Sequence, residues 1–181
     1  MKSIRQDDAI DSKTISNSID YRKTMELSGY WLLITNAVGW MIMQVGIGYF
    51  VTKIPDSFLD HKLWLFKTRS WERAGSIYDR CFFVRRWKSL LPSGATILGG
   101  FSIKRVSSRN EEYLKQWGRE SCRAELTHWF CIIPVLLFFV WNPLIGDIIN
   151  LAYALVANLP CIIAQRYNRP RILIFLAKHF G

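Results

Sequence analysis

Glu125 and His128 are the two side chains of this 181-residue chain whose type and spacing best fit proton-transfer chemistry. Residues three apart in a helix share a face, so we expect the carboxylate and the imidazole to lie together where a charged segment meets an apolar one. An imidazole titrates near neutrality and can accept a proton at working pH. The carboxylate could bond the other ring nitrogen or stabilise the imidazolium as it forms. The pair predicts a general base, His128, held by Glu125.

Two other interpretations of this pair stay open. It could be a hydrated interfacial pair without chemistry. The Glu-x-x-His spacing is also that of di-iron bundles, which need it on two helices, whereas here it occurs once. We therefore predict no metal site. Glu72 is a second candidate acid, for which the competing role is a surface partner of Arg69 or Arg73.

The pair opens a segment, 123–171, with the pattern of a membrane hairpin. Two apolar blocks are separated by Asn142-Pro143 and by Asp147, which is the only formal charge in the apolar part. The lengths suit two helices, about 127–145 and 147–165, close to the shortest that cross a hydrocarbon core of about 30 Å. For either block alone, a buried helix of a soluble protein is the alternative.

An earlier apolar run, 30–51, predicts another span, because it is uncharged and has aromatic residues at both ends. A cleaved signal peptide fits less well, since the run is too long and no small-residue cleavage site follows. We predict an all-α integral membrane protein with about three transmembrane helices in one membrane-embedded domain, 30–181. Residues 1–29 are polar without clear periodicity and predict a mobile N-terminal head.

One side of the last predicted span is small and polar. Its members recur at spacings of four and three: Asn150, Ala154, Asn158, Cys161 and Gln165. Polar groups in a span face protein or water, because each unpaired group in lipid costs several kcal/mol. The stripe therefore predicts either packing between helices or part of a site.

Residues 52–126 form a basic, aromatic-rich interfacial region between the first two spans. Lys and Arg outnumber Asp and Glu there, within a net charge of +10 for the whole chain. Beside membrane spans, anionic lipid headgroups account for such a surface at about 1 kcal/mol per cation. The motifs of nucleic-acid-binding proteins do not accompany it. The bias of Lys and Arg predicts that this region and the C-terminus are cytoplasmic.

Smaller patterns add local expectations. Ser108 and Glu111 match a capping box, which predicts a helix that runs into the second span. Pro and Gly at 91–94 and 99–100 predict a turn or loop. The four cysteines form no CxxC pair, so neither a disulfide framework nor a zinc site is expected.

Several segments together resemble a known family: IPDSF at 54–58, SWERAG at 70–75, FFVRRWKSLLP at 82–92, RAELTHW at 123–129 and ALVANLPCIIAQRYNRPR at 154–171. They look like the glycosyl-4,4'-diaponeurosporenoate acyltransferases of staphyloxanthin-type carotenoid synthesis. The resemblance implies a small multi-pass cell-membrane acyltransferase. Its acceptor would be a sugar hydroxyl of a glycosylated polyisoprenoid, a carotenoid glycoside or a related lipid-linked sugar.

Acyl transfer to a hydroxyl needs a base and groups that bind both substrates. The expected catalytic residues are His128 and Glu125. Expected substrate-binding residues are Arg123 and Arg166 for an acyl donor's phosphates or its thioester oxygen, and Asn158 and Gln165 for the sugar, together with Arg169 and Glu72. No cofactor is expected, because acyl-CoA or acyl carrier protein would act as a substrate.

A function of a different class stays open. The chain could be a non-catalytic membrane subunit that holds lipid or carotenoid enzymes together through its aromatic interfacial region. An enzyme should turn over alone, whereas a scaffold should copurify with partners and be inactive alone.

Overall fold

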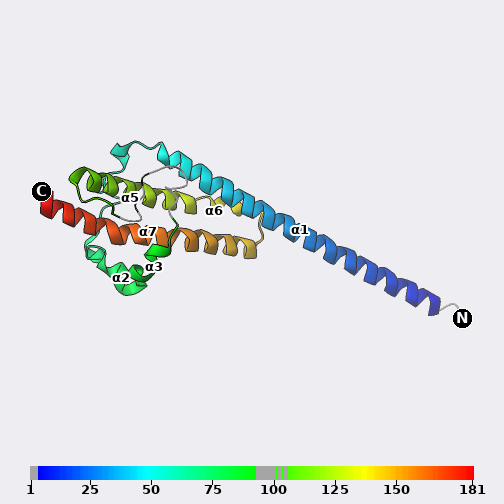
Figure 1. Cartoon of the computed structure of the whole chain (residues 1–181). Helices are drawn as coiled ribbons and strands as arrows, with labels where there is room; N and C mark the ends of the chain where they lie inside the picture. The colour runs from blue at the N-terminus through cyan, green and yellow to red at the C-terminus, as the bar shows by residue number, and fades with distance from the viewer. Residues whose placement is uncertain (1–3, 93–100, 102, 104–105) are drawn as a thin grey trace. The chain divides into compact units, whose positions relative to one another are not determined.

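The computed structural model describes residues 4–92, 101, 103 and 106–181, with side chains from residue 28 onward in these ranges. The predicted turns at 91–94 and 99–100 fall mostly outside these residues. The described part of the chain is helical and contains no strand (Figure 1). Its elements are α1 (Ile4–Thr52), η1 (Asp56–Phe58), η2 (Ser70–Glu72), α2 (Ser76–Phe82), α3 (Val84–Trp87), η3 (Lys88–Leu90), α5 (Glu111–Ile132), α6 (Val135–Phe138) and α7 (Leu144–Phe180).

Three segments are long and apolar enough to cross a membrane: Ser28–Thr52, Glu111–Phe138 and Leu144–Phe180. This confirms the predicted all-α membrane fold with about three spans. The second and third segments are longer than predicted, since the second begins well before the apolar block and the third continues past the basic cluster. Within these extensions, the charges of Glu125, Arg166 and Arg169 are paired inside the protein rather than exposed to lipid.

The chain divides into two compact units, one up to Ile42 and one from Met43 onward. The first consists of most of α1. Its described side chains include exposed Tyr30, Trp31 and Leu33, as a lipid-facing helix would have. Residues 4–29 of the expected head lie on this helix, and their mobility stays a prediction.

In the second unit α5 and α7 pack side by side and antiparallel (Figure 1). The chain turns between α6 and α7 at Asn142-Pro143, where the sequence predicts the break. The polar stripe of α7 faces protein, as one of the expected alternatives requires. Four of its five members are buried: Asn150, Ala154, Asn158 and Cys161. Burial provides these polar groups with partners that lipid could not supply.

The start of α5 corrects one expectation. The N-cap is Asn110, whose side-chain Oδ1 accepts a hydrogen bond from the backbone N–H of Tyr113 at 2.8 Å. Ser108 Oγ instead accepts from the N–H of Asn110 at 3.3 Å. The predicted capping box was wrong because Asn caps as well as Ser does and stands next to the helix. The predicted helix that runs into the second span is confirmed.

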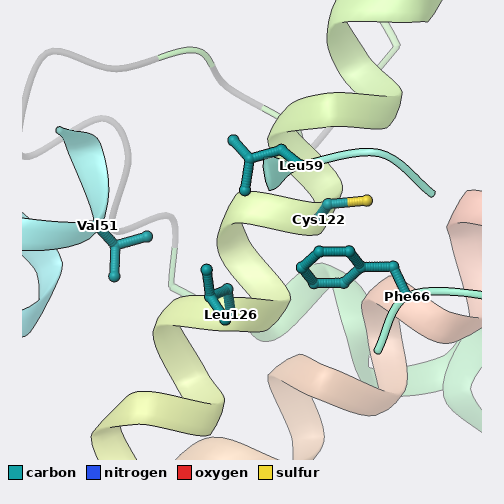
Figure 2. Packing of buried hydrophobic residues seen from close by; sticks show 5 residues of the cluster. All are labelled: Val51, Leu59, Phe66, Cys122 and Leu126. Atoms are coloured by element: carbon teal, nitrogen blue, oxygen red, sulfur yellow. The ribbon is translucent and has the colours of Figure 1, made fainter. Parts of the chain in front are cut away.

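Figure 2 shows the hydrophobic cluster that joins the end of α1 to α5. It contains Val51 of α1, Leu59 and Phe66 of the following loop, and Cys122 and Leu126 of α5. Burying each large apolar side chain contributes about 1.5–3 kcal/mol. The cluster therefore fixes the loop across one face of α5.

A second cluster joins α2 and α3 to α7. Tyr78, Val84 and Tyr167 are its buried members. The interfacial region thus contacts both helices of the hairpin, through Phe66 on one side and Tyr78 on the other.

Candidate active site

A turn after η2 lies directly against α7. Residues 73–75 adopt positive φ angles of 48°, 55° and 82°. A Cβ atom at Gly75 would lie 2.8 Å from the carbonyl oxygen of Tyr167 and 2.9 Å from that of Arg166, so only glycine permits this approach. Pro170 lacks the N–H that would bind the Arg166 carbonyl, which opens α7 at the contact. The turn brings Glu72 to α7.

Glu125 is fully buried on α5 and binds two arginines of α7. Its Oε1 accepts hydrogen bonds from Arg166 Nε at 2.7 Å and from Trp129 Nε1 at 3.3 Å. Its Oε2 accepts from Arg169 Nη2 at 2.5 Å. Bonds between ionised partners are roughly twice as strong as neutral ones. Both carboxylate oxygens are therefore held by charge-assisted bonds.

The two arginines extend this network to the interfacial region. Arg166 Nη1 donates to Glu72 Oε1 at 2.7 Å, and Arg166 Nη2 donates to the carbonyl of Leu65. Arg169 Nη2 donates to the carbonyl of Phe66 at 3.0 Å. Glu72 is 1% exposed, so it is an internal partner rather than a surface acid.

Tyr78 borders the network from α2. Burial, followed by the negative charge of Glu72, raises the pKa of Tyr78 to about 12, although Arg166 opposes the shift. The phenol therefore stays protonated at physiological pH.

The network balances two carboxylates, Glu72 and Glu125, with two guanidinium groups, Arg166 and Arg169. Removing charges from water is costly, and mutual attraction offsets this only while each partner remains. We name these four residues the buried ion network. It joins α5, α7 and the interfacial region, and it fixes the turn of α5 next to His128.

His128 lies one turn after Glu125, is partly exposed, and binds α7 through a different residue. Its Nδ1 lies 2.9 Å from Asn158 Oδ1. Asn158 Nδ2 donates to the carbonyl of Ala154 at 2.9 Å, so the amide oxygen is the atom that faces the imidazole. We therefore assign the proton of the neutral ring to Nδ1, which leaves the lone pair on Nε2. This tautomer can accept a proton at Nε2.

The expected pairing of Glu125 with His128 is not the pairing in the structure. Glu125 binds Arg166 and Arg169, and His128 binds Asn158. Two guanidinium groups attract a buried carboxylate more strongly than a neutral imidazole does, because opposite charges interact strongly away from water. The Glu-x-x-His spacing correctly predicted that both residues lie on one helix, but it did not determine which residues they bind.

The other expected site residues also have protein partners. Arg123 Nη1 donates to the carbonyls of Val51 at 2.9 Å and Ile54 at 2.8 Å, where the end of α1 leaves carbonyls without helical partners. Arg123 also pairs with Asp56. Gln165 Oε1 accepts from Ser121 Oγ at 3.1 Å, which leaves the amide N–H groups of Gln165 to donate elsewhere.

Sequence reasoning missed two contributors to this site. Gly75 permits the close approach of the turn, and Tyr78 packs beside the network. The glycine in SWERAG was the available signal, since glycine commonly marks a backbone contact. In the described part of the chain, no group of three or more His, Cys, Asp or Glu side chains is placed to hold a metal ion.

Comparison with known proteins gives a consistent result. The family model for glycosyl-4,4'-diaponeurosporenoate acyltransferase matches residues 62–178. Proteins of that name from Staphylococcus aureus strains USA300 and N315 are each 36% identical to this chain over 134 residues, which is 74% of this chain and 81% of theirs. No solved structure matches significantly. The matched region contains the buried ion network, His128 and Asn158, and the chain belongs to the glycosyl-4,4'-diaponeurosporenoate acyltransferase family.

Proposed function

We propose that this protein transfers a fatty acyl chain to a sugar hydroxyl of a glycosylated carotenoid or a related lipid-linked sugar. Family membership and the names of the relatives support the reaction and the class of acceptor. The observation that carries the mechanism is the hydrogen bond between His128 Nδ1 and Asn158 Oδ1, because it leaves Nε2 as the proton acceptor.

In the proposed step, His128 Nε2 takes the proton of the sugar hydroxyl while the hydroxyl oxygen attacks the carbonyl carbon of the acyl donor. The bond from this carbon to the sulfur of a thioester then breaks. The imidazolium gives its proton to the departing sulfur, so the products are a sugar ester and a free thiol. His128 returns to its neutral form.

Asn158 acts as a positioning residue in this mechanism. Its amide is fixed by the carbonyl of Ala154, and it in turn fixes the orientation and tautomer of the His128 ring. The equivalent task in a Ser-His-Asp triad falls to the carboxylate. A neutral amide performs it here without adding a charge next to the apolar part of the hairpin.

The buried ion network supports the base indirectly. Glu125 holds Arg166 and Arg169, and this fixes the adjacent turn of α5. We propose that these residues, with Glu72, maintain the geometry rather than bind substrate. Gln165 keeps its expected role, since its amide N–H groups can donate to a sugar oxygen.

The proposed donor is acyl-CoA or acyl carrier protein, used as a substrate without a further cofactor. The hydrocarbon chains of donor and acceptor would stay in the bilayer, and the reacting groups would meet at its surface. We propose that the interfacial region and the C-terminus are cytoplasmic, as the Lys and Arg bias favours. In this proposal the site meets its acyl donor on the cytoplasmic side.

The test uses the purified chain alone in phosphatidylcholine nanodiscs, with a glycosylated carotenoid acid and acyl-CoA or acyl carrier protein. We expect ester formation by mass spectrometry, and a rate about 10²–10⁴-fold lower for His128→Ala, the usual contribution of a general base. His179→Ala is the matched control, because His179 is exposed near the end of α7. Unchanged ester formation by His128→Ala would refute the mechanism, and no ester from the wild type would favour the scaffold.

A further inference from the structure

Three cationic side chains surround Tyr167 of α7, outside the buried ion network. The Arg171 guanidinium lies 3.6 Å from the centre of the Tyr167 ring, and Lys88 Nζ lies 4.8 Å from it. Arg85 of α3 lies near the same residue, and the Tyr167 side chain, followed by Asp79, raises the pKa of Arg85. Three positive charges from α3, η3 and α7 therefore converge on one aromatic residue.

The charge of this cluster is only partly balanced. Asp79 pairs with Arg85, with 3.3 Å between Oδ2 and Nη2. Lys88 Nζ donates to Asn168 Oδ1 at 2.6 Å, and that partner is neutral. Burial lowers the pKa of Lys88, as do the positive charges of Arg171 and Arg85, although Tyr167 and Asp79 oppose the shift. Like charges held together favour binding of an anion.

The buried ion network differs from this cluster in its balance of charge. There, each arginine has a carboxylate partner within 2.7 Å, and Arg166 has two. Among the described residues, three cations here share one carboxylate, and Arg85 is 74% exposed. The cluster around Tyr167 thus combines excess positive charge with access from outside.

We propose that Arg85, Lys88 and Arg171 form a binding site for a phosphate group. Guanidinium groups match phosphate oxygens with paired N–H donors, and a lysine adds a point charge. Two sources carry this chemistry: the phosphates of an acyl-CoA or phosphopantetheine donor, and the phosphodiester of a membrane lipid. Assignment to the donor rests on the function proposed above, whereas phosphate binding does not.

Spacing along α7 favours the donor. Asn158, which holds the base, and Arg171 are separated by 13 positions. At a rise of about 1.5 Å per residue they lie about 20 Å apart along the helix. An extended pantetheine arm separates a thioester from the phosphates of CoA by a distance of this order. Because 13 positions are about 3.6 turns, the two residues also lie on different sides of α7, so the arm would have to pass around the helix for the thioester to reach His128.

The test measures binding of radiolabelled CoA, without acyl group or acceptor, to the full chain in phosphatidylcholine nanodiscs. We expect the double variant Lys88→Gln/Arg171→Gln to bind CoA at least about tenfold more weakly, because the loss of a hydrogen bond to a charged group weakens affinity by about this factor. Arg86→Gln is the matched control, because this neighbouring arginine lies over Phe83, 5.2 Å from the centre of its ring. It should bind CoA as the wild type does.

A second measurement on the same proteins identifies the source of the phosphate. Native mass spectrometry counts phosphatidylglycerol molecules retained by each variant in detergent. Loss of CoA binding supports the site with the donor as its ligand, and loss of retained phosphatidylglycerol alone supports it with a lipid headgroup. If the double variant matches Arg86→Gln in both measurements, the site is overturned.

This result is separable from the catalytic proposal. His128→Ala should bind CoA normally, because His128 does not belong to the cluster. Full ester formation by His128→Ala, with intact CoA binding, would refute the base alone. Unchanged binding by the double variant would refute the phosphate site and leave the base untouched.

Discussion

The buried carboxylate of Glu125 could bind either the nearby imidazole or guanidinium groups. In this protein the opposite charge of the guanidinium groups decides which of them it binds. Glu125 binds two guanidinium groups, and His128 is left to a neutral amide. The structure therefore separates two residues that the spacing in the sequence predicted to act as one pair. In the proposed mechanism, Glu125 maintains the fold and His128 exchanges protons.

The glutamate therefore carries a stability prediction. Glu125→Gln keeps the shape but removes the negative charge between two buried arginines, and we expect a loss of roughly 3–5 kcal/mol. The control is Glu111→Gln at the start of α5, whose partner Lys115 is exposed, so its loss should be under about 1 kcal/mol. Thermal unfolding in detergent measures both. Equal stability of the two variants, with activity lost only in Glu125→Gln, would return Glu125 to a catalytic role.

Tyr78 gives the ion network a measurable pH dependence. Because the pKa of Tyr78 is raised to about 12 in the folded state, the folded chain holds this proton over a range where the unfolded chain releases it. The stabilisation is fully present below the unfolded pKa of about 10 and is lost as the pH rises towards 12. We expect the unfolding temperature of the wild type to fall more steeply than that of Tyr78→Phe as the pH rises from about 9 to about 12, which brackets that range. Parallel curves would contradict this.

At the scale of elements, one turn carries the interfacial region onto the membrane hairpin. The contact between Gly75 and the backbone of α7 places Glu72 beside Arg166. The turn is held in a backbone conformation that costs about 1–3 kcal/mol for each non-glycine residue, so the contacts around it must outweigh that cost.

Gly75→Ala tests this contact. A methyl group there would meet two backbone carbonyls and a positive φ angle, so we expect the variant to lose about 1–3 kcal/mol and to lower the unfolding temperature. Gly46→Ala is the control, because a Cβ at Gly46 has nothing within 4 Å and alanine favours the interior of α1. An unfolding temperature for Gly75→Ala at or above that of Gly46→Ala would show that the contact is dispensable.

The elements were more predictable than the partners of individual side chains. Apolar runs identify the three spans, because a bilayer requires length and uniform composition. The polar spacing of α7 identifies a protein-facing side, and Asn158 was on it. Which residue binds His128 depends on the relative position of α5 and α7, and no local pattern encodes that. The turn at Gly75 likewise depends on a residue more than ninety positions later.

At the largest scale, the unit from Met43 onward is a membrane hairpin with an interfacial region bound across it. Large exposed apolar residues of the connection after α6 and the start of α7, such as Val140, Leu144 and Ile145, suit contact with lipid. Polar and charged groups gather inside, where they pair with one another. Such a molecule can leave the hydrocarbon chains of its substrates in the bilayer and supply only the reacting groups.

The central claim is that the imidazole at position 128 is the base for acyl transfer. The most direct measurement is the rate of ester formation by purified His128→Gly in nanodiscs, with and without added imidazole, at matched folded protein. We predict that the variant is nearly inactive and that imidazole restores part of the rate by occupying the space of the missing ring. Ester formation at the wild-type rate without imidazole would contradict the account.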